Sequence, residues 1–305
     1  MRTLPLTVIA LLATTLWAAA QISVEVVLDQ EQFLRDEPLP VRVRITNRSG
    51  RPLQLGQDNQ WLGFALESLD GVVISRLGEV PVTGEFKLES ARMATREVDL
   101  MPCFDLSQAG RYTVVATVRI KEWNEEIASK PKEFEIVRGT KLWEQDFGIP
   151  LTAGAPESRK YALQQASYRK QLKLYLRVTD LNDHKVFRVF ALGPMVSFSQ
   201  VEAQVDKTSD LYALFQTGAR SFLFYVINPN GEVMIRQTYD YATTRPTLRA
   251  NDEGRIFVMG GSRRPTGSDI PAALANNTTP TGVSSNSAPA KGPVEGRDNA
   301  KPRKK

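Results

Sequence analysis

Hydrophobic and polar residues alternate with a period of two through residues 22–137, and turn residues interrupt the alternation about every ten positions. Because side chains of a β-strand point alternately to opposite faces, this pattern predicts strands with one buried face and one solvated face. The clearest runs cover residues 22–28, 40–46, 62–66 and 134–136. Short strands at this spacing are typical of an antiparallel β-sandwich, which we expect over residues 21–138.

One turn within this domain has a specific signature. The dipeptide Asp70-Gly71 follows the run 62–66 and precedes the apolar residues 72–74. Asp-Gly suits the tight turns that join neighbouring antiparallel strands. The sequence therefore predicts a hairpin between these two segments.

The segment 105–118 reads DLSQAGRYTVVATV and places Tyr112 at the start of a strand. It resembles the tyrosine corner of immunoglobulin-like and fibronectin-like sandwiches, in which the Tyr hydroxyl bonds back to the backbone upstream. Val114 stands where an antibody domain carries its second Cys, so the resemblance is to disulfide-free relatives. The resemblance implies architecture alone, because such domains serve adhesion, carbohydrate binding, protease inhibition and spacing alike.

The sequence after the first domain changes character. Residues 139–160 contain Pro150 and Pro156 and predict an interdomain linker. Residues 157–173 are rich in helix formers and predict one short helix between the two β domains. An extended first strand through the same residues is the alternative.

An internal repeat predicts the architecture of residues 161–261. Residues 180–188 parallel 228–236, and residues 206–212 parallel 251–257. Each copy holds two predicted hairpins, which gives a β-meander of about eight strands, and four strands per repeat resemble the blades of a β-propeller. Two blades do not close a ring, so the strands could form one compact antiparallel domain, pack against the first domain, or assemble with other copies. We favour the compact domain.

The aromatic residues are mostly predicted to be core. Residues 221–227 are apolar on both alternating faces, which indicates a strand that is covered on both sides. A sugar-stacking platform is the alternative for a few exposed candidates. These candidates are Trp61, Trp123, Trp143, Tyr239 and Tyr241.

The start of the chain resembles a secretory signal peptide. Arg2 precedes an apolar run over residues 4–17, and Ala18-Ala19-Ala20 has the form of a cleavage site before Gln21. An uncleaved membrane anchor is the alternative, but Pro5 interrupts the run, which is shorter than the roughly 20 residues that a spanning helix needs. We expect residues 1–20 to be removed, no later transmembrane segment, and an exported protein in the periplasm or outside the cell.

The positive charge is concentrated at the other end. The net charge is +5, and residues 262–305 hold eight of the 39 basic and three of the 34 acidic residues, so the rest is neutral. A neutral body does not attract polyanions, which argues against a nucleic-acid partner. The composition beyond residue 261 predicts a disordered basic tail that could bind anionic envelope polymers electrostatically. The residues that would carry this attraction are Lys301, Arg303, Lys304 and Lys305.

Residue types that carry catalysis or bind metals are scarce. Cys103 is the single cysteine, so no internal disulfide can form, and His184 is the single histidine, in a predicted turn. The acidic segments 206–210 and 251–254 suit tight turns better than a calcium loop. We therefore predict no catalytic residue, no cofactor site and no metal site.

The chain as a whole resembles uncharacterised secreted proteins of verrucomicrobial-type bacteria, best over residues 160–265, and this resemblance implies an envelope or secreted location without an activity. The segments that carry it include 192–199 and 245–249. We expect a non-enzymatic binding or scaffolding protein that recognises a protein or a glycan through loops of its β domains. A secreted protease inhibitor that uses an end loop of the sandwich is the alternative, and an enzyme of unrecognised type is the third interpretation.

Overall fold

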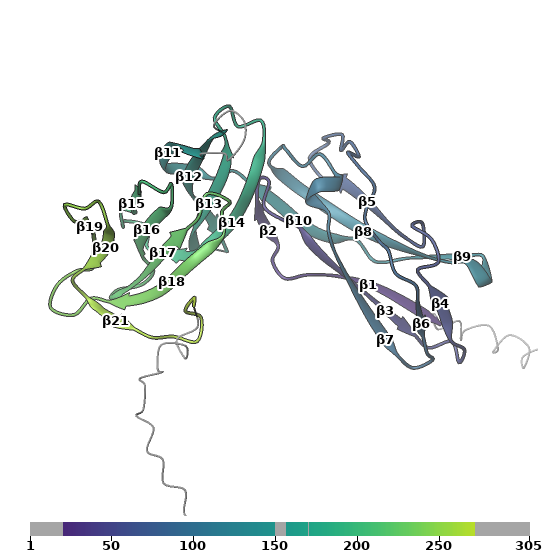
Figure 1. The fold of residues 1–305 in the computed structure, drawn as a ribbon. Coiled ribbons are helices and arrows are strands. Elements are labelled where there is room, and N and C mark those ends of the chain that lie inside the picture. Colours follow the sequence, from purple (N-terminus) through teal and green to yellow (C-terminus); the bar gives the residue numbers. More distant parts are fainter. Residues whose placement is uncertain (1–20, 150–156, 170, 272–305) are drawn as a thin grey trace, which may run out of the picture.

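A computed structural model describes residues 21–149, 157–169 and 171–271, and Figure 1 shows the fold. The regular secondary structure of the described chain is almost entirely β-strand, as predicted, and its helical segments are two short 3-10 turns, Met101–Cys103 and Lys121–Trp123. Within these residues no helix has the length and apolar character needed to cross a membrane. The predicted signal peptide lies outside the described residues.

The first unit contains strands β1 to β10. They are β1 (Ile22–Leu28), β2 (Gln32–Leu34), β3 (Pro40–Asn47), β4 (Leu53–Leu55), β5 (Leu62–Ser68), β6 (Phe86–Leu88), β7 (Met93–Asp99), β8 (Gly110–Ile120), β9 (Glu125–Ala128) and β10 (Lys132–Val137). One sheet has the order β1-β3-β7, and a second has the order β2-β10-β8-β5 with β9 added to β8. A small sheet pairs β4 with β6.

The core of this unit follows from the alternation in its strands. In β3, every second residue is fully buried, and the arginines between them are partly exposed. Inward residues of both larger sheets belong to one buried cluster, which includes Val43, Phe134 and Val114. Cys103 is buried in the same cluster and is a free thiol.

Tyr112 lies at the start of β8 and makes the hydrogen bond that the sequence predicts. Its hydroxyl donates to the backbone oxygen of Gln108 at 2.7 Å. Its ring is buried and stacks on Phe134 of β10 at a centroid distance of 5.6 Å. The hydrogen bond closes the entry loop onto the strand, while the resemblance to immunoglobulin-like domains stays a prediction.

The hairpin predicted at Asp70-Gly71 is wrong. Gly71 does turn the chain with a φ of 78°, but residues 72–74 form no strand, and β5 pairs with β8 instead. The carboxylate of Asp70 accepts the backbone N–H of Arg111 at 2.7 Å, and the N–H of Leu69 donates to the Arg111 oxygen at 2.8 Å. The turn is therefore tied to the start of β8, and residues 72–74 form no strand that pairs with β5.

The second unit contains strands β11 to β21. They are β11 (Thr140–Ile149), β12 (Glu157–Tyr168), β13 (Gln171–Asp180), β14 (Val186–Met195), β15 (Glu202–Val205), β16 (Leu211–Gln216), β17 (Ser221–Ile227), β18 (Val233–Asp240), β19 (Thr247–Ala250), β20 (Ile256–Met259) and β21 (Ser262–Arg264). The sheets have the orders β11-β12-β13-β14, β15-β16-β17-β18-β21 and β19-β20.

The predicted linker and the predicted helix are both corrected. Most of the segment 139–160 belongs to β11 and β12, and the segment predicted as a helix forms β12 and the start of β13. β12 pairs with β11 on one side and with β13 on the other. Tyr161 and Leu163 face one core, whereas Ala166 faces the first unit, so the strand is buried on both faces. Pairing on two sides overrides the local helix propensity.

The sheets of the second unit are stacked in layers. The first core lies between β11–β14 and β15–β18, and a second, smaller core lies between β15–β18 and the β19-β20 hairpin. Residues Phe222–Ile227 of β17 are all buried, as the two-sided apolar pattern predicts. This strand contributes alternate side chains to the two cores.

All four repeated segments lie at hairpin turns. They separate β13 from β14, β15 from β16, β17 from β18, and β19 from β20. However, the repeat copy β13 to β16 does not form a sheet of its own. Its first hairpin, β13 and β14, belongs to one sheet, and its second hairpin, β15 and β16, belongs to the next. The unit has eleven strands rather than about eight, because β11 and β21 lie outside the predicted domain and β12 stands where a helix was predicted.

The predicted start of the tail at residue 262 is also wrong. β21 pairs with the end of β18, and the guanidinium of Arg264 lies 2.8 Å from the carboxylate of Asp240. Arg263 pairs at 3.3 Å with Asp269, whose side chain is buried. Residues 262–271 therefore belong to the second unit, and the rest of the predicted tail lies outside the described residues.

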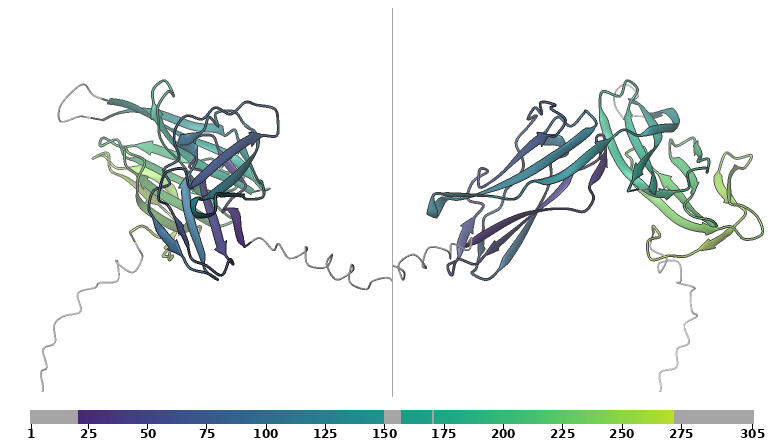
Figure 2. Two further views of the ribbon diagram at one scale, coloured as in Figure 1. Left: turned by 90° about the vertical axis from the view of Figure 1, so that its right-hand side faces the viewer. Right: turned by 180° about the vertical axis from the view of Figure 1, so that it is seen from behind.

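The two units meet through a separate apolar cluster, in which the ends of β2 and β10 contact the outer face of the β11–β14 sheet (Figures 1 and 2). The buried members are Leu34, Ala166, Tyr175 and Val189, with Val137, Val186 and Ala191 packed against them. Burial of apolar side chains from both units stabilises their contact.

Candidate functional site

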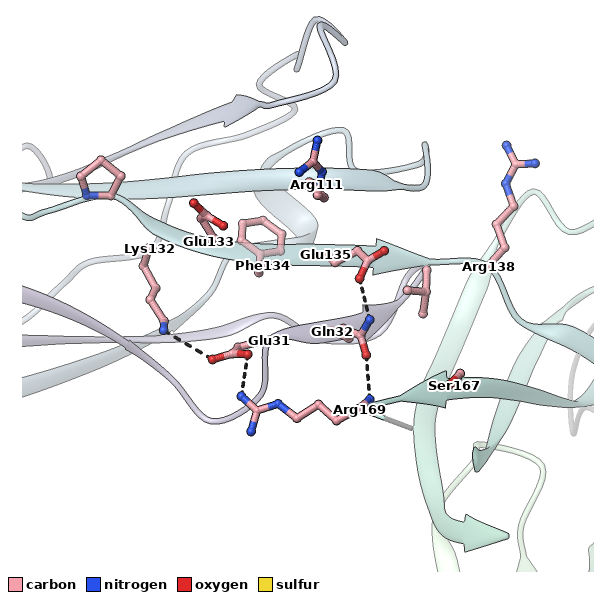
Figure 3. A pocket seen from close by; sticks show the side chains of 12 residues that line it. Glu31, Gln32, Arg111, Lys132, Glu133, Phe134, Glu135, Arg138, Ser167 and Arg169 are labelled. Atoms are coloured by element: carbon pink, nitrogen blue, oxygen red, sulfur yellow. Dashed lines mark hydrogen bonds and ion pairs between the residues drawn. The ribbon is translucent and has the colours of Figure 1, made fainter. Parts of the chain in front are cut away.

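A groove with a volume of about 930 Å³ lies along one side of the contact between the units (Figure 3). We call it the junction groove. Its floor is the solvent-facing side of β10, and its walls come from β8, from the start of β2 and from the β12–β13 turn. The lining residues are Glu31, Gln32, Arg111, Pro131, Lys132, Glu133, Phe134, Glu135, Val137, Arg138, Ser167 and Arg169.

Glu31 is the centre of an ion-pair network in the groove. Its carboxylate lies 2.5 Å from the guanidinium of Arg169 and 3.8 Å from the ammonium of Lys132 (Figure 3). The hydrogen bond and the charge of Arg169 lower the pKa of Glu31 below its usual value. The carboxylate is thus anionic at neutral pH and links the two units.

Gln32 makes a second link between the units. Its amide nitrogen donates to the carboxylate of Glu135 at 2.5 Å, and its amide oxygen accepts the backbone N–H of Arg169 at 3.2 Å. Arg169 has a φ of 44°, which fits the sharp turn between β12 and β13. The turn is therefore fastened to β2 by side-chain and backbone contacts together.

A smaller recess of about 370 Å³ lies on another side of the contact and shares Arg138 with the groove. Here the guanidinium of Arg177 lies 2.6 Å from the carboxylate of Asp36 and donates to the backbone oxygen of Arg35 at 3.3 Å. Lys160 pairs with Asp183 at 2.7 Å, and this contact raises the pKa of Lys160. The contact between the units thus combines an apolar centre with ion pairs around it.

The groove mixes both signs of charge. Its lining has four basic and three acidic side chains, which are Arg111, Lys132, Arg138 and Arg169, and Glu31, Glu133 and Glu135. Along β10, Lys132, Glu133 and Glu135 are at least partly exposed. Ser167 is the single hydroxyl group in this lining. Such a surface can form several ion pairs with an extended polymer that carries both charges.

The residues singled out for chemistry are not brought together. His184 is exposed in the β13–β14 turn, as expected, and Cys103 lies in the core of the other unit. The four basic residues Lys301, Arg303, Lys304 and Lys305 lie outside the described residues.

The candidate sugar-stacking aromatics are also dispersed. Trp61 is buried and donates its indole N–H to Val82, and Trp123 packs against the same core. Trp143 packs against the core of the second unit and Tyr239 against the smaller core beside it. Tyr241 differs from them, because its side chain is 41% exposed beside a small hollow.

The polar side chains of the acidic turns accept hydrogen bonds from backbone N–H groups of the same turn. One carboxylate oxygen of Asp206 accepts the backbone N–H groups of Thr208 and Asp210, each at 2.9 Å. Asn251 accepts the N–H of Arg255 at 2.8 Å in the equivalent way. In the part of the chain that the structure describes, no group of three His, Cys, Asp or Glu side chains is placed to hold a metal ion.

Sequence reasoning missed the residues of the junction. Glu31 and Arg169, like Asp36 and Arg177, are far apart in the chain and belong to no local motif. Only a prediction of which strands meet across the two units could have paired them. Comparison of the chain with protein-family models, with curated proteins and with solved structures found no match.

Proposed function

We propose that this protein is an exported, non-enzymatic binding or scaffolding protein of the bacterial cell envelope or exterior, and that the junction groove is where it recognises a protein partner. The observation that carries the proposal is the preformed groove, whose walls come from both units. Buried apolar residues and the pairs of Glu31 and Arg177 hold these walls together. A rigid site avoids the ordering cost that weakens binding by flexible surfaces.

The charge pattern supports an extended protein segment as the ligand. Basic and acidic side chains both line the groove, and Glu133 is exposed there. A segment with both signs of charge could pair with them, while a uniformly charged polymer would meet repulsion. The signal-like start of the chain supports an exported location, where such a partner would be an envelope or secreted protein.

The test is cross-linked capture of partners from the secreted and envelope fractions of the source bacterium. Glu133→Lys changes the charge in the groove, and Glu125→Lys makes the same change on the exposed strand β9, outside the groove. We expect the wild-type protein and Glu125→Lys to capture the same proteins, and Glu133→Lys to lose them.

Identical capture by all three proteins would contradict the assignment of the groove. Turnover of an ester, glycoside or peptide substrate, or inhibition of a protease panel, with no captured partner would favour the alternative functions.

A further inference from the structure

A second hollow lies on the second unit, at the end of the sheet where β17 begins and β18 ends. Its volume is about 490 Å³, within the range of about 300–1,000 Å³ that small ligands occupy. We call it the arginine shelf. Its lining residues are Gln216, Ala219, Arg220, Phe222, Tyr241 and Arg245.

Arg220 is held in place by the backbone of the opposite strand end. Its Nε and one terminal nitrogen donate to the backbone oxygen of Tyr241 at 3.2 and 2.9 Å. The backbone N–H of Tyr241 in turn donates to the oxygen of Arg220 at 2.7 Å. The two side-chain bonds fix the guanidinium at the hollow and leave its other terminal nitrogen out of the contact, while the backbone bond holds the two strand ends together.

Arg245 reaches the same hollow from the loop after β18. Its guanidinium carbon lies 5.4 Å from the centroid of the Phe222 ring, and Phe222 is 3% exposed, so the ring forms an apolar floor. Tyr241 adds a second aromatic ring, 5.8 Å from the guanidinium carbon of Arg220. The hollow thus places two cations beside two aromatic rings.

The positive charges of Arg220 and Arg245 have no acidic counterpart in the lining of the shelf. No acidic residue is among its lining residues, and within the described chain neither Arg220 nor Arg245 has a carboxylate within 4.0 Å. Asp240, the neighbour of Tyr241, is engaged by Arg264 at 2.8 Å and by Ser221 at 3.1 Å. The side chains that line the shelf therefore carry a net charge of +2, whereas the junction groove contains both basic and acidic side chains.

We propose that the arginine shelf binds an acidic saccharide through the carboxylate of a uronate unit. A guanidinium presents parallel N–H groups that match the two oxygens of a carboxylate. An exposed aromatic ring such as Tyr241 can pack against the apolar face of a sugar ring. Together the two features select a sugar that carries a negative charge and disfavour a neutral one.

The experiment is calorimetric titration of the full protein with trigalacturonate, with neutral galactotriose and with a sulfated trisaccharide. We expect binding of trigalacturonate, no binding of galactotriose, and weaker binding at 0.5 M salt, because salt screens exposed charges. Arg245→Gln should weaken the affinity by roughly tenfold or more, as expected for loss of a charged hydrogen-bonding group. Tyr241→Ala should also weaken it.

Arg249→Gln is the matched control, because Arg249 is an exposed arginine on β19 and is not part of the shelf. Equal losses of affinity for trigalacturonate in Arg245→Gln and Arg249→Gln would show that the overall positive charge of the protein, including that of the chain end, attracts the sugar. This result would overturn the proposal. Equal binding of galactotriose, tighter binding of the sulfated sugar, or no binding of trigalacturonate would overturn it too. Glu133→Lys should leave this binding unchanged, which separates the shelf from the proposed function of the groove.

Discussion

The guanidinium of Arg177 on β13 lies 2.6 Å from the carboxylate of Asp36, which follows β2, and so pairs the two units of the chain. The side chain of Arg177 is 10% exposed and that of Asp36 is 26% exposed. Asp36 has a φ of 64°, a conformation that Asn also tolerates. The pair can therefore be tested with variants that preserve the local backbone.

We expect Asp36→Asn and Arg177→Gln each to lower the free energy of unfolding by about 2 kcal/mol, because each breaks a largely buried ion pair, while the longer contact of Asp36 with Arg35 at 3.5 Å offsets part of the loss in Arg177→Gln. The double variant should lose less than the sum of the two, as expected for groups in contact. Urea unfolding of the four proteins measures this. The exposed pair Lys87 and Glu89, 2.8 Å apart, is the control and should show a coupling near zero. Strict additivity for Asp36 and Arg177 would show that the pair does not stabilise the junction.

The hydroxyl of Tyr112 can be removed without changing the ring. Tyr112→Phe loses the 2.7 Å hydrogen bond to Gln108 and leaves that backbone oxygen without its partner. We expect a loss of about 1 kcal/mol in the free energy of unfolding. The same change at the exposed Tyr241 should have little effect. A stability equal to that of the wild-type protein would show that water replaces the bond.

Two glycines with similar backbone angles separate strain from crowding. Gly50 has a φ of 79° and Gly56 a φ of 83°, but a Cβ at Gly50 meets nothing within 4 Å, whereas a Cβ at Gly56 would collide with the backbone oxygen of Gly84. Gly50→Ala should cost about 1 kcal/mol for the left-handed conformation alone. Gly56→Ala should cost clearly more. Thermal unfolding of both variants measures the difference, and equal losses would contradict the close approach.

Glu37 should make stability depend on pH. Burial raises the pKa of this carboxyl above 4.5, although the N–H of Leu34 and the amide of Gln30 both donate to it. The folded protein keeps this proton at pH values where the unfolded chain has lost it. Its contribution to stability therefore falls as pH rises from about 4.5 through the raised pKa.

Glu37→Gln removes this titration. We expect the difference in unfolding free energy, wild type minus variant, to decrease over that pH range and to level off above it. Urea unfolding at a series of pH values between about 4 and 8 measures the difference. A difference that stays constant or increases would show that burial does not raise the pKa of Glu37.

The basic end of the chain gives a separate prediction. Deletion of residues 272–305 removes six basic and two acidic residues, among them Lys301, Arg303, Lys304 and Lys305. We expect an unchanged thermal midpoint and a loss of retention on anionic liposomes. Salt should have the same effect, because the screening length is only about 8 Å at 0.15 M. Retention that survives both treatments would place the attraction on the β units.

Local pattern determined several parts of this fold. The period-two alternation predicted β1, β3, β5 and β10, because a strand with one solvated face repeats every second residue. The two-sided apolar run predicted the burial of β17, and the segment 105–118 predicted the hydrogen bond from Tyr112 to the backbone upstream. Each of these signals is contained in fewer than about 15 consecutive residues.

Tertiary structure decided the rest, because strand pairing joins residues that are distant in the sequence. β12 consists of helix-forming residues, yet it is a strand because β11 and β13 pair with it on both sides. β21 is joined to the fold by its contact with β18. Glu31 and Arg169, and Arg220 and Arg245, come together only when the units and loops are in place. The sequence alone therefore determined the β class and many strands, while the pairing of distant segments decided where the groove and the shelf lie.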